Sequence, residues 1–475
     1  MKKVWLVVAL AALGGLASKT FADVQNIRLS GDIRIRGYFL DSTGVNPSTA
    51  PVGQFDANES FISQRTRVSC EADLEDHVLV VVTLKAEGEW GAGTGTSEYV
   101  GAGAANGNII NRAWSVGFDE AYVQFNEIFY TPATLKLGRQ FLQYGRGLIL
   151  SSVEQEYNYD AGRLVLDYYP LTIDIVGAEL VNNQAFSGQP SQNGANDLLF
   201  VNARYELSDS AIKDVEAYVG WVSQSASAPN SGSPGPGLGS FTTSRLPATF
   251  QGSSPIIVGV RADINPVDAL QTWWEAAYEF GADGYDADGT IGAFLLNAGG
   301  KYTLKDVQWV PAFNANFIYA SGGGKGQDPT SGVAGNAQFR PWFDYADGYN
   351  GYLFEPALSN IGIFNLGASV KPYENTTLAL QGYYYIKADK YGISGSNGNV
   401  DWGGPAWASP ASTGVSNTGN NQDLGWELDA ILGYDYSKDV RAQLVYGVFL
   451  PAQAYSAEGV SRAAEEVRAE VDVKF

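Results

Sequence analysis

Short and long connections alternate along the whole of this chain, between segments in which apolar and polar residues themselves alternate. Residues 27–39 carry apolar residues or glycine at odd positions and mostly charged or polar residues at even positions. Residues 466–475 show the same period of two. This period is typical of a β-strand that has one apolar face.

The connections between these segments fall into two length classes. Short turns are predicted at 75–76, 126–132, 169–170, 208–213, 265–268, 305–306, 371–375 and 437–439. Longer polar loops are predicted at 41–58, 91–112, 142–157, 181–196, 223–254, 281–290, 320–358, 389–422 and 451–463. The two lists alternate and together imply about 18 strands. A sandwich or propeller has no reason to separate its loops by length, whereas a bacterial outer-membrane barrel does.

The sequence therefore predicts an all-β fold, a transmembrane antiparallel β-barrel of about 18 strands. It would have short periplasmic turns, long extracellular loops and both termini on the periplasmic side. Its location would be the cell outer membrane, with outer-membrane lipid against its apolar face. Aromatic residues near the strand ends suit the two interfacial girdles of such a barrel: Trp90, Phe125, Tyr168, Trp221, Tyr302, Trp309, Tyr319, Tyr384, Trp426, Tyr434 and Tyr436.

Composition removes several other classes of function. After residue 22 there is no apolar run of 18 residues, so no transmembrane helix is predicted. A net charge of -21 argues against a nucleic-acid partner, because phosphate binding draws on clustered positive charge. The single cysteine excludes an internal disulfide, and the single histidine leaves little machinery for acid–base catalysis. We therefore expect no enzyme activity, no catalytic residues, no cofactor and no metal centre.

The N-terminus has the form of an export signal. Lys2 and Lys3 precede an apolar run over 4–16, and Thr20 and Ala22 fit a small-x-small cleavage site. We expect residues 1–22 to be removed and residues 23–475 to form the barrel.

Arginines are concentrated on the polar face of the first strands. Arg34 and Arg36 share one face of the first strand, and Arg65 and Arg67 share the polar face of its hairpin neighbour. Fixed cations on the wall of a pore attract anions and repel cations. The other interpretation is structural, with these arginines paired to acids such as Asp32 and Glu71 as braces of the wall. Further arginines that phase toward the lumen come from other strands: Arg204 and Arg261.

Three short motifs carry a resemblance to a known family. Leu-Gly-Arg-Gln at 137–140 is followed by Tyr-Gly-Arg-Gly-Leu at 144–148 and Tyr-Asp-Ala-Gly-Arg-Leu at 159–164. This stretch resembles the alginate-export family of outer-membrane barrels. The resemblance implies an 18-stranded barrel with an arginine-rich lumen for an anionic polysaccharide, and it makes Arg139 and Arg163 candidate pore arginines.

The expected function is a passive outer-membrane channel, or porin, for polar sugars or small solutes, anionic ones among them. Two alternatives stay open at this stage. One is a dedicated exporter of an anionic exopolysaccharide, and the other is a receptor or scaffold whose surface loops bind a partner.

Four local features complete the expectations. The terminal aromatic Phe475 resembles the signal read by the barrel-assembly machinery. Pro311 would interrupt a strand predicted over 307–320 and force a bulge or an earlier strand end. Cys70 phases to the lipid face beside Val68. A Ca²⁺ site at Asp283, Asp286 and Asp288 is less favoured than a solvated loop, because the calcium-loop pattern is incomplete.

Overall fold

The computed structural model describes the strands, the short turns and parts of the long connections. The described residues are 26–45, 55–74, 77–91, 114–152, 158–181, 196–207, 211–224, 254–282, 290–323, 337–339, 342, 350–354, 356, 358–389, 394–395, 399–400, 421–456 and 463–475. The predicted signal at 1–22 and the three aspartates at 283–288 lie outside this part of the chain.

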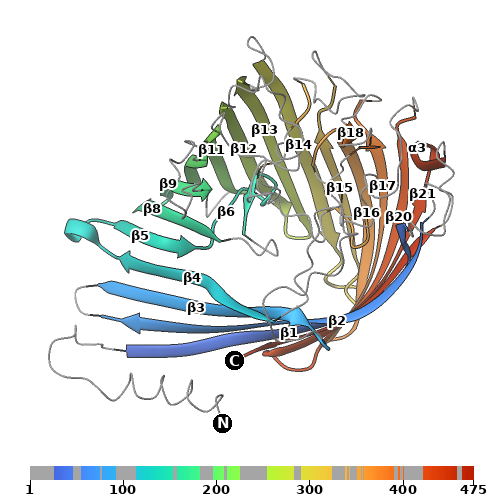
Figure 1. Cartoon of the computed structure of the whole chain (residues 1–475), viewed down its shortest axis with the longest axis horizontal. Helices are drawn as coiled ribbons and strands as arrows, with labels where there is room; N and C mark the ends of the chain where they lie inside the picture. Colours follow the sequence, from blue (N-terminus) through green and yellow to red (C-terminus); the bar gives the residue numbers. More distant parts are fainter. Residues whose placement is uncertain are drawn as a thin grey trace, which may run out of the picture.

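Eighteen strands form one sheet that closes on itself (Figure 1). They are β1 (Asn26–Val45), β2 (Phe55–Asp73), β3 (Val78–Glu89), β4 (Ser115–Phe125), β5 (Ala133–Gln140), β8 (Tyr159–Tyr168), β9 (Leu171–Val181), β10 (Asn196–Glu206), β11 (Ile212–Gln224), β12 (Ser254–Val267), β13 (Leu270–Ala282), β14 (Thr290–Thr303), β15 (Ala312–Ala320), β16 (Ile361–Tyr373), β17 (Thr376–Lys387), β20 (Asp423–Asp435), β21 (Val440–Pro451) and β22 (Ala464–Lys474). Each pairs antiparallel with the next, and β22 pairs with β1.

The remaining elements are short. They are η1 (Ile128–Tyr130), β6 (Gln143–Tyr144), β7 (Leu150–Ser151), β18 (Ser394–Gly395), β19 (Asn399–Val400) and α3 (Gln453–Ser456). No helix in the described part of the chain is long and apolar enough to cross a membrane.

The predicted fold class and connection pattern are confirmed. The closed sheet is all antiparallel, and short turns such as 169–170 and 374–375 alternate with long connections. The strand that was expected over 307–320 begins only at Ala312, because Pro311 lies at the end of a longer turn. There the carbonyl of Pro311 accepts a hydrogen bond from the amide of Leu304. Proline has no amide hydrogen to donate to a ladder, so the strand starts after it.

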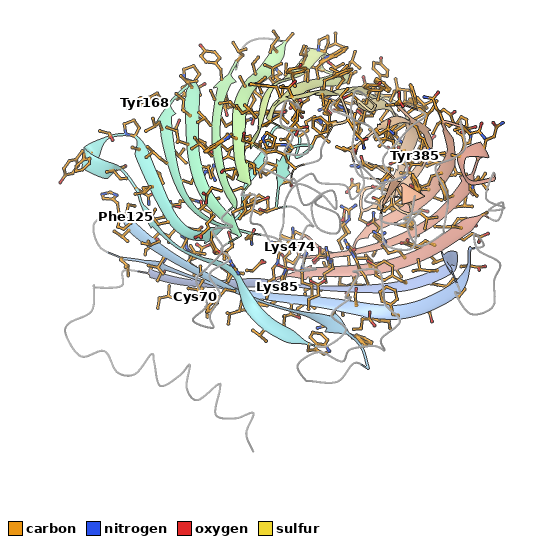
Figure 2. The ribbon with its side chains drawn as sticks, turned by 45° about the horizontal axis from the view of Figure 1, so that its top comes forward. Cys70, Lys85, Phe125, Tyr168, Tyr385 and Lys474 are labelled. Carbon is orange, nitrogen blue, oxygen red and sulfur yellow. The ribbon has the colours of Figure 1, made fainter. Side chains whose placement is uncertain are left out.

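The two faces of the sheet divide by residue type. On β1, Leu29 lies on the outer face with 73% of its surface exposed, and Cys70 is its cross-strand partner. Lys85 and Lys474 lie on the lumen side of the same wall (Figure 2). Phe125 and Tyr168 lie exposed on the outside near strand ends, as predicted for an aromatic girdle.

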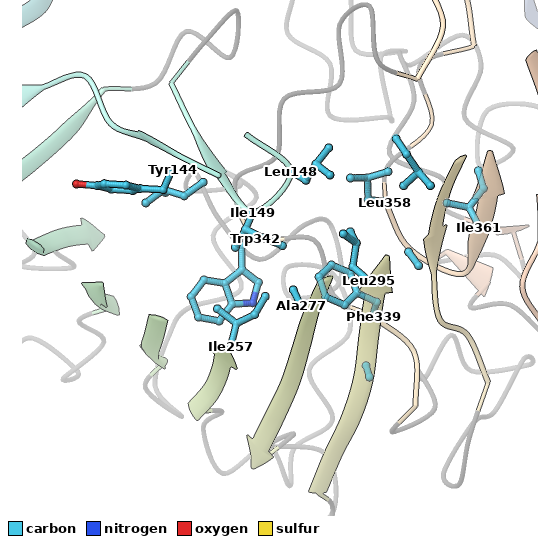
Figure 3. Packing of buried hydrophobic residues seen from close by; sticks show 14 of the residues in the cluster. Tyr144, Leu148, Ile149, Ile257, Ala277, Leu295, Phe339, Trp342, Leu358 and Ile361 are labelled. Atoms are coloured by element: carbon cyan, nitrogen blue, oxygen red, sulfur yellow. The ribbon is translucent and has the colours of Figure 1, made fainter. Parts of the chain in front are cut away.

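The buried apolar cluster lies inside the barrel. Residues from the connection between β5 and β8 and from the connection between β15 and β16 pack against inward-facing side chains of the wall (Figure 3). The prediction that 142–157 is a polar external loop is wrong for its described part, because four of its apolar side chains are fully buried: Leu142, Leu148, Ile149 and Leu150.

Candidate functional site

The inner faces of β1–β4 and β22 form a surface that we call the charged wall. The strand register places Asp472, Arg34, Arg65 and Glu87 side by side across β22, β1, β2 and β3. Two residues along, the corresponding row is Lys474, Asp32, Arg67 and Lys85. Opposite residues of an antiparallel pair share one face of the sheet, so these charges all point to the lumen.

The four arginines predicted on the first two strands lie on this wall. Arg65 pairs with Asp32 at 3.3 Å, and Arg67 pairs with Asp32 at 2.6 Å. Arg36 pairs with Glu470, and Arg34 is buried. The arginines therefore have the expected inward orientation, and carboxylates fix the side chains of Arg36, Arg65 and Arg67.

Three further predicted arginines lie on the inner face beyond the charged wall. Arg163 pairs with Asp174 on β9, and Arg204 pairs with Asp214 on β11 at 2.6 Å. Arg261 on β12 donates to Glu216 at 2.8 Å and lies 3.6 Å from Asp214. These ion pairs link neighbouring strands.

Arg139 does not line the lumen, which corrects the expectation drawn from the family resemblance. The pairing of β5 with β4 and β8 runs through Gly138 without a register shift, so Arg139 keeps the outward phase of the exposed Leu137. Its guanidinium pairs with Asp160 at 2.7 Å, and both side chains are exposed. A strand without a bulge cannot turn this side chain inward.

Residues 142–152, which we call the inserted hairpin, fold into the lumen. The amide of Gly145 donates to Glu216 at 2.8 Å, and the amide of Arg146 donates to Glu275 at 3.0 Å. A side chain at Gly145 would place its Cβ 2.4 Å from Glu275 Oε1, and Gly145 has a φ of 60°. Glycine is needed here because the backbone comes so close to the wall carboxylate.

Two other side chains anchor the inserted hairpin. The Tyr144 hydroxyl donates to Asp174 at 2.9 Å. Burial raises the pKa of the Tyr144 hydroxyl, so this donor stays protonated. The Arg146 guanidinium lies 4.6 Å from the ring centroid of Trp273 and 3.6 Å from Asp263. The Tyr-Gly-Arg-Gly motif thus fixes a loop inside the barrel.

Residues 350–354, which we call the inserted strap, are held by another wall carboxylate. Glu427 on β20 is 2% exposed, and it accepts the amides of Tyr352, Leu353 and Phe354 at 2.8, 2.9 and 2.9 Å. It also accepts the Tyr385 hydroxyl at 3.0 Å. Successive amides that converge on one carboxylate form strong, charge-assisted hydrogen bonds. Sequence reasoning missed Glu427 in this role, because nothing local links it to a loop more than 70 residues earlier.

The apolar cluster lies against one side of the barrel wall. Its wall members, in the part of the chain that the structure describes, come from β8–β17 and β20–β22, and none comes from β1–β5. The lumen is therefore packed with apolar side chains on one side and lined by charged side chains on the other.

Comparisons with known proteins agree with this architecture. The model of a family described as alginate export matches residues 53–469. No curated protein matches the chain. Three of the similar solved structures are outer-membrane proteins of Pseudomonas aeruginosa. OccK2 (OpdF) in complex with glucuronate is 10% identical with a TM-score of 0.53, and the match covers 96% of this chain and 97% of that one. OpdK with vanillate is 9% identical (TM-score 0.53, covering 94% of this chain and 98% of that one), and OpdQ is 11% identical (TM-score 0.54, covering 96% and 99%). At these identities the likeness concerns the fold.

Proposed function

Since this chain belongs to the alginate-export family and is an outer-membrane channel, we propose that it admits small polar solutes that carry a carboxylate, by passive diffusion along the charged wall. The observation that carries the proposal is the division of the lumen. Among the described residues, the apolar cluster takes its wall side chains from β8–β17 and β20–β22, whereas the inner faces of β1–β3 carry the fixed charges.

Two features favour carboxylates as the permeating groups. Arg34 and Arg65 are direct cross-strand partners, and Arg67 and Lys85 are partners in the adjacent row. Such pairs place two positive charges side by side on the pore wall, with Asp32 and Asp119 as their acidic neighbours. Adjacent cations interact favourably with an anion in a narrow lumen. Two of the similar structures, OccK2 and OpdK, contain glucuronate and vanillate, and both are ring compounds that bear a carboxylate.

A second candidate is the passage of an anionic polysaccharide, which the description of the family favours. A polymer would have to thread past the inserted hairpin and the inserted strap. The duration of current block by oligosaccharides of increasing length separates this candidate from a small-solute channel. An oligomer that threads through the barrel blocks the current for a longer time as its length grows.

The proposal includes the fate of the N-terminus and the absence of chemistry. We propose that residues 1–22 are an export signal, so the mature chain would begin at Asp23. Intact mass of the protein extracted from outer membranes tests this cleavage. The predicted absence of enzyme activity is part of the same proposal, since a diffusion channel needs no reacting groups.

Bilayer conductance of the full-length mature protein tests the function directly. We expect channels in KCl, a reversal potential shifted toward anions, and faster vesicle swelling in glucuronate than in glucose after correction for ion flux. Absence of conductance in correctly folded barrels would refute the channel. Conducting barrels with strong cation selectivity would refute the preference for carboxylates and leave the channel itself standing.

A further inference from the structure

Two aromatic rings interrupt the polar inner face of β1 and β2. Tyr38 and Phe61 are cross-strand partners, and their rings stack at a centroid distance of 4.7 Å with 19° between their planes. Between residues 28 and 36 of β1 and 63 and 73 of β2, the inner face carries only arginine, serine and acidic residues. Both rings are half-buried, so part of this apolar surface faces the lumen.

The inserted strap brings a third ring to the same place. The Arg468 guanidinium on β22 lies 5.3 Å from the ring centroid of Tyr38 and 5.5 Å from that of Tyr352. Arg468 also donates to the Tyr352 carbonyl at 2.8 Å and to Glu466 at 2.6 Å. The strap and the wall therefore meet at an arginine that contacts an aromatic ring from each.

Charged residues lie beside the stacked rings on the wall. Tyr38 is the cross-strand partner of Arg468, and Arg36 in the next row pairs with Glu470. A wall brace at this level needs only ion pairs of the kind found throughout the charged wall. Stacked rings add an apolar face at the edge of the polar path, and such a face combined with a few fixed polar groups is typical of a small-molecule site.

We propose that Tyr38, Phe61 and Tyr352 form a stacking subsite for six-membered rings on solutes that travel along the charged wall. The inference rests on the proposed function and adds to it a selection by shape. A sugar acid and an aromatic acid both present an apolar ring face to these side chains, whereas an open-chain acid of the same charge does not. The attraction between stacked rings amounts to about a 2- to 12-fold difference in binding.

Current-block experiments on the full barrel compare ring and chain acids of equal charge. The pairs are glucuronate against gluconate and benzoate against hexanoate. We expect the ring member of at least one pair to block about 2- to 12-fold more strongly than its chain partner. Phe61→Ser should abolish this difference, and Phe61→Tyr should keep it. Phe39→Ser is the matched control, because Phe39 lies on the outer face of the neighbouring strand β1, at the same level of the wall.

The outcomes separate the subsite from the channel. A wild-type barrel that conducts KCl but blocks equally with both members of both pairs would overturn the subsite alone. So would a ring preference that survives in Phe61→Ser. Discrimination only within the sugar pair would identify sugar acids as the solutes, and discrimination only within the aromatic pair would identify aromatic acids. If Phe61→Ser does not insert, Phe61→Leu carries the test, since it keeps the apolar volume without the ring.

Discussion

Replacing Glu427 by glutamine tests whether a wall carboxylate holds the inserted strap in the lumen. Oε1 of Glu427 accepts the amides of Tyr352 and Leu353, and Oε2 accepts the amide of Phe354 and the Tyr385 hydroxyl. In glutamine Oε2 becomes an NH₂ group, which can accept neither the Phe354 amide nor the Tyr385 hydroxyl. The two bonds that remain lose their charge assistance. Hydrogen bonds to charged groups contribute about 1.5–3 kcal/mol and neutral ones about 0.5–1.5 kcal/mol. For the bonds of the strap, losing one and weakening two therefore amounts to about 3–6 kcal/mol.

This loss shifts the equilibrium between the docked and undocked strap by on the order of 10²- to 10⁴-fold, since about 1.4 kcal/mol corresponds to a factor of ten. The assay is the rate at which a thiol reagent labels Tyr352→Cys in a Cys70→Ala background. We expect labelling at least about tenfold faster in Glu427→Gln, with noisier single-channel current, because an undocked strap exposes residue 352 for a larger share of the time.

Glu465→Gln is the control for this substitution. Glu465 accepts a hydrogen bond from Tyr446 at 3.2 Å, and that contact is exposed. Equal labelling rates in Glu427→Gln and Glu465→Gln, with unchanged current noise, would refute the reasoning. The apolar packing of Leu353 and Phe354 would then be enough to hold the strap.

Three further predictions follow from the wall, the last strand and the connections. Replacing all four of Arg34, Arg36, Arg65 and Arg67 by glutamine should shift the reversal potential toward cations, and the shift should be larger at low salt. Arg139→Gln should leave the reversal potential unchanged, because Arg139 faces outward. An unchanged potential in the fourfold variant would mean that these arginines only brace the wall. Phe475→Asp should lower the amount of heat-modifiable barrel in the membrane, because the exposed Phe475 ring shares the apolar outer face with Val471, where a carboxylate is costly. Normal levels would contradict a role of Phe475 in recognition by the assembly machinery. A cysteine placed at 223–254 or 389–422 should react with a membrane-impermeant reagent on intact cells, whereas one at 371–375 should not. The reverse pattern would overturn the prediction that the long loops are extracellular and the short turns periplasmic.

The sequence by itself determined the barrel. Alternation with a period of two defines strands whose opposite faces differ, and eight short turns among longer connections define their number and their alternating direction. Both signals are local, so they can be read without knowing what any strand pairs with. The same phase placed Arg34, Arg36, Arg65 and Arg67 on the inner face, where the structure has them.

Only the tertiary structure decided what fills the lumen. A loop that contains Tyr144, Gly145 and Arg146 looks external in a sequence, because the carboxylates that bind it belong to β9, β11, β12 and β13 and reach it only after the barrel closes. Glu427 and the strap are likewise far apart in the chain and adjacent in space. For Arg139 the motif predicted a side chain in the pore, but the pairing of β5 continues without a register shift and leaves this side chain on the outer face. The physical reason is that hydrogen bonds and ion pairs across a closed barrel depend on which strands face each other. The alternation of residues along a single strand does not determine which strands those are.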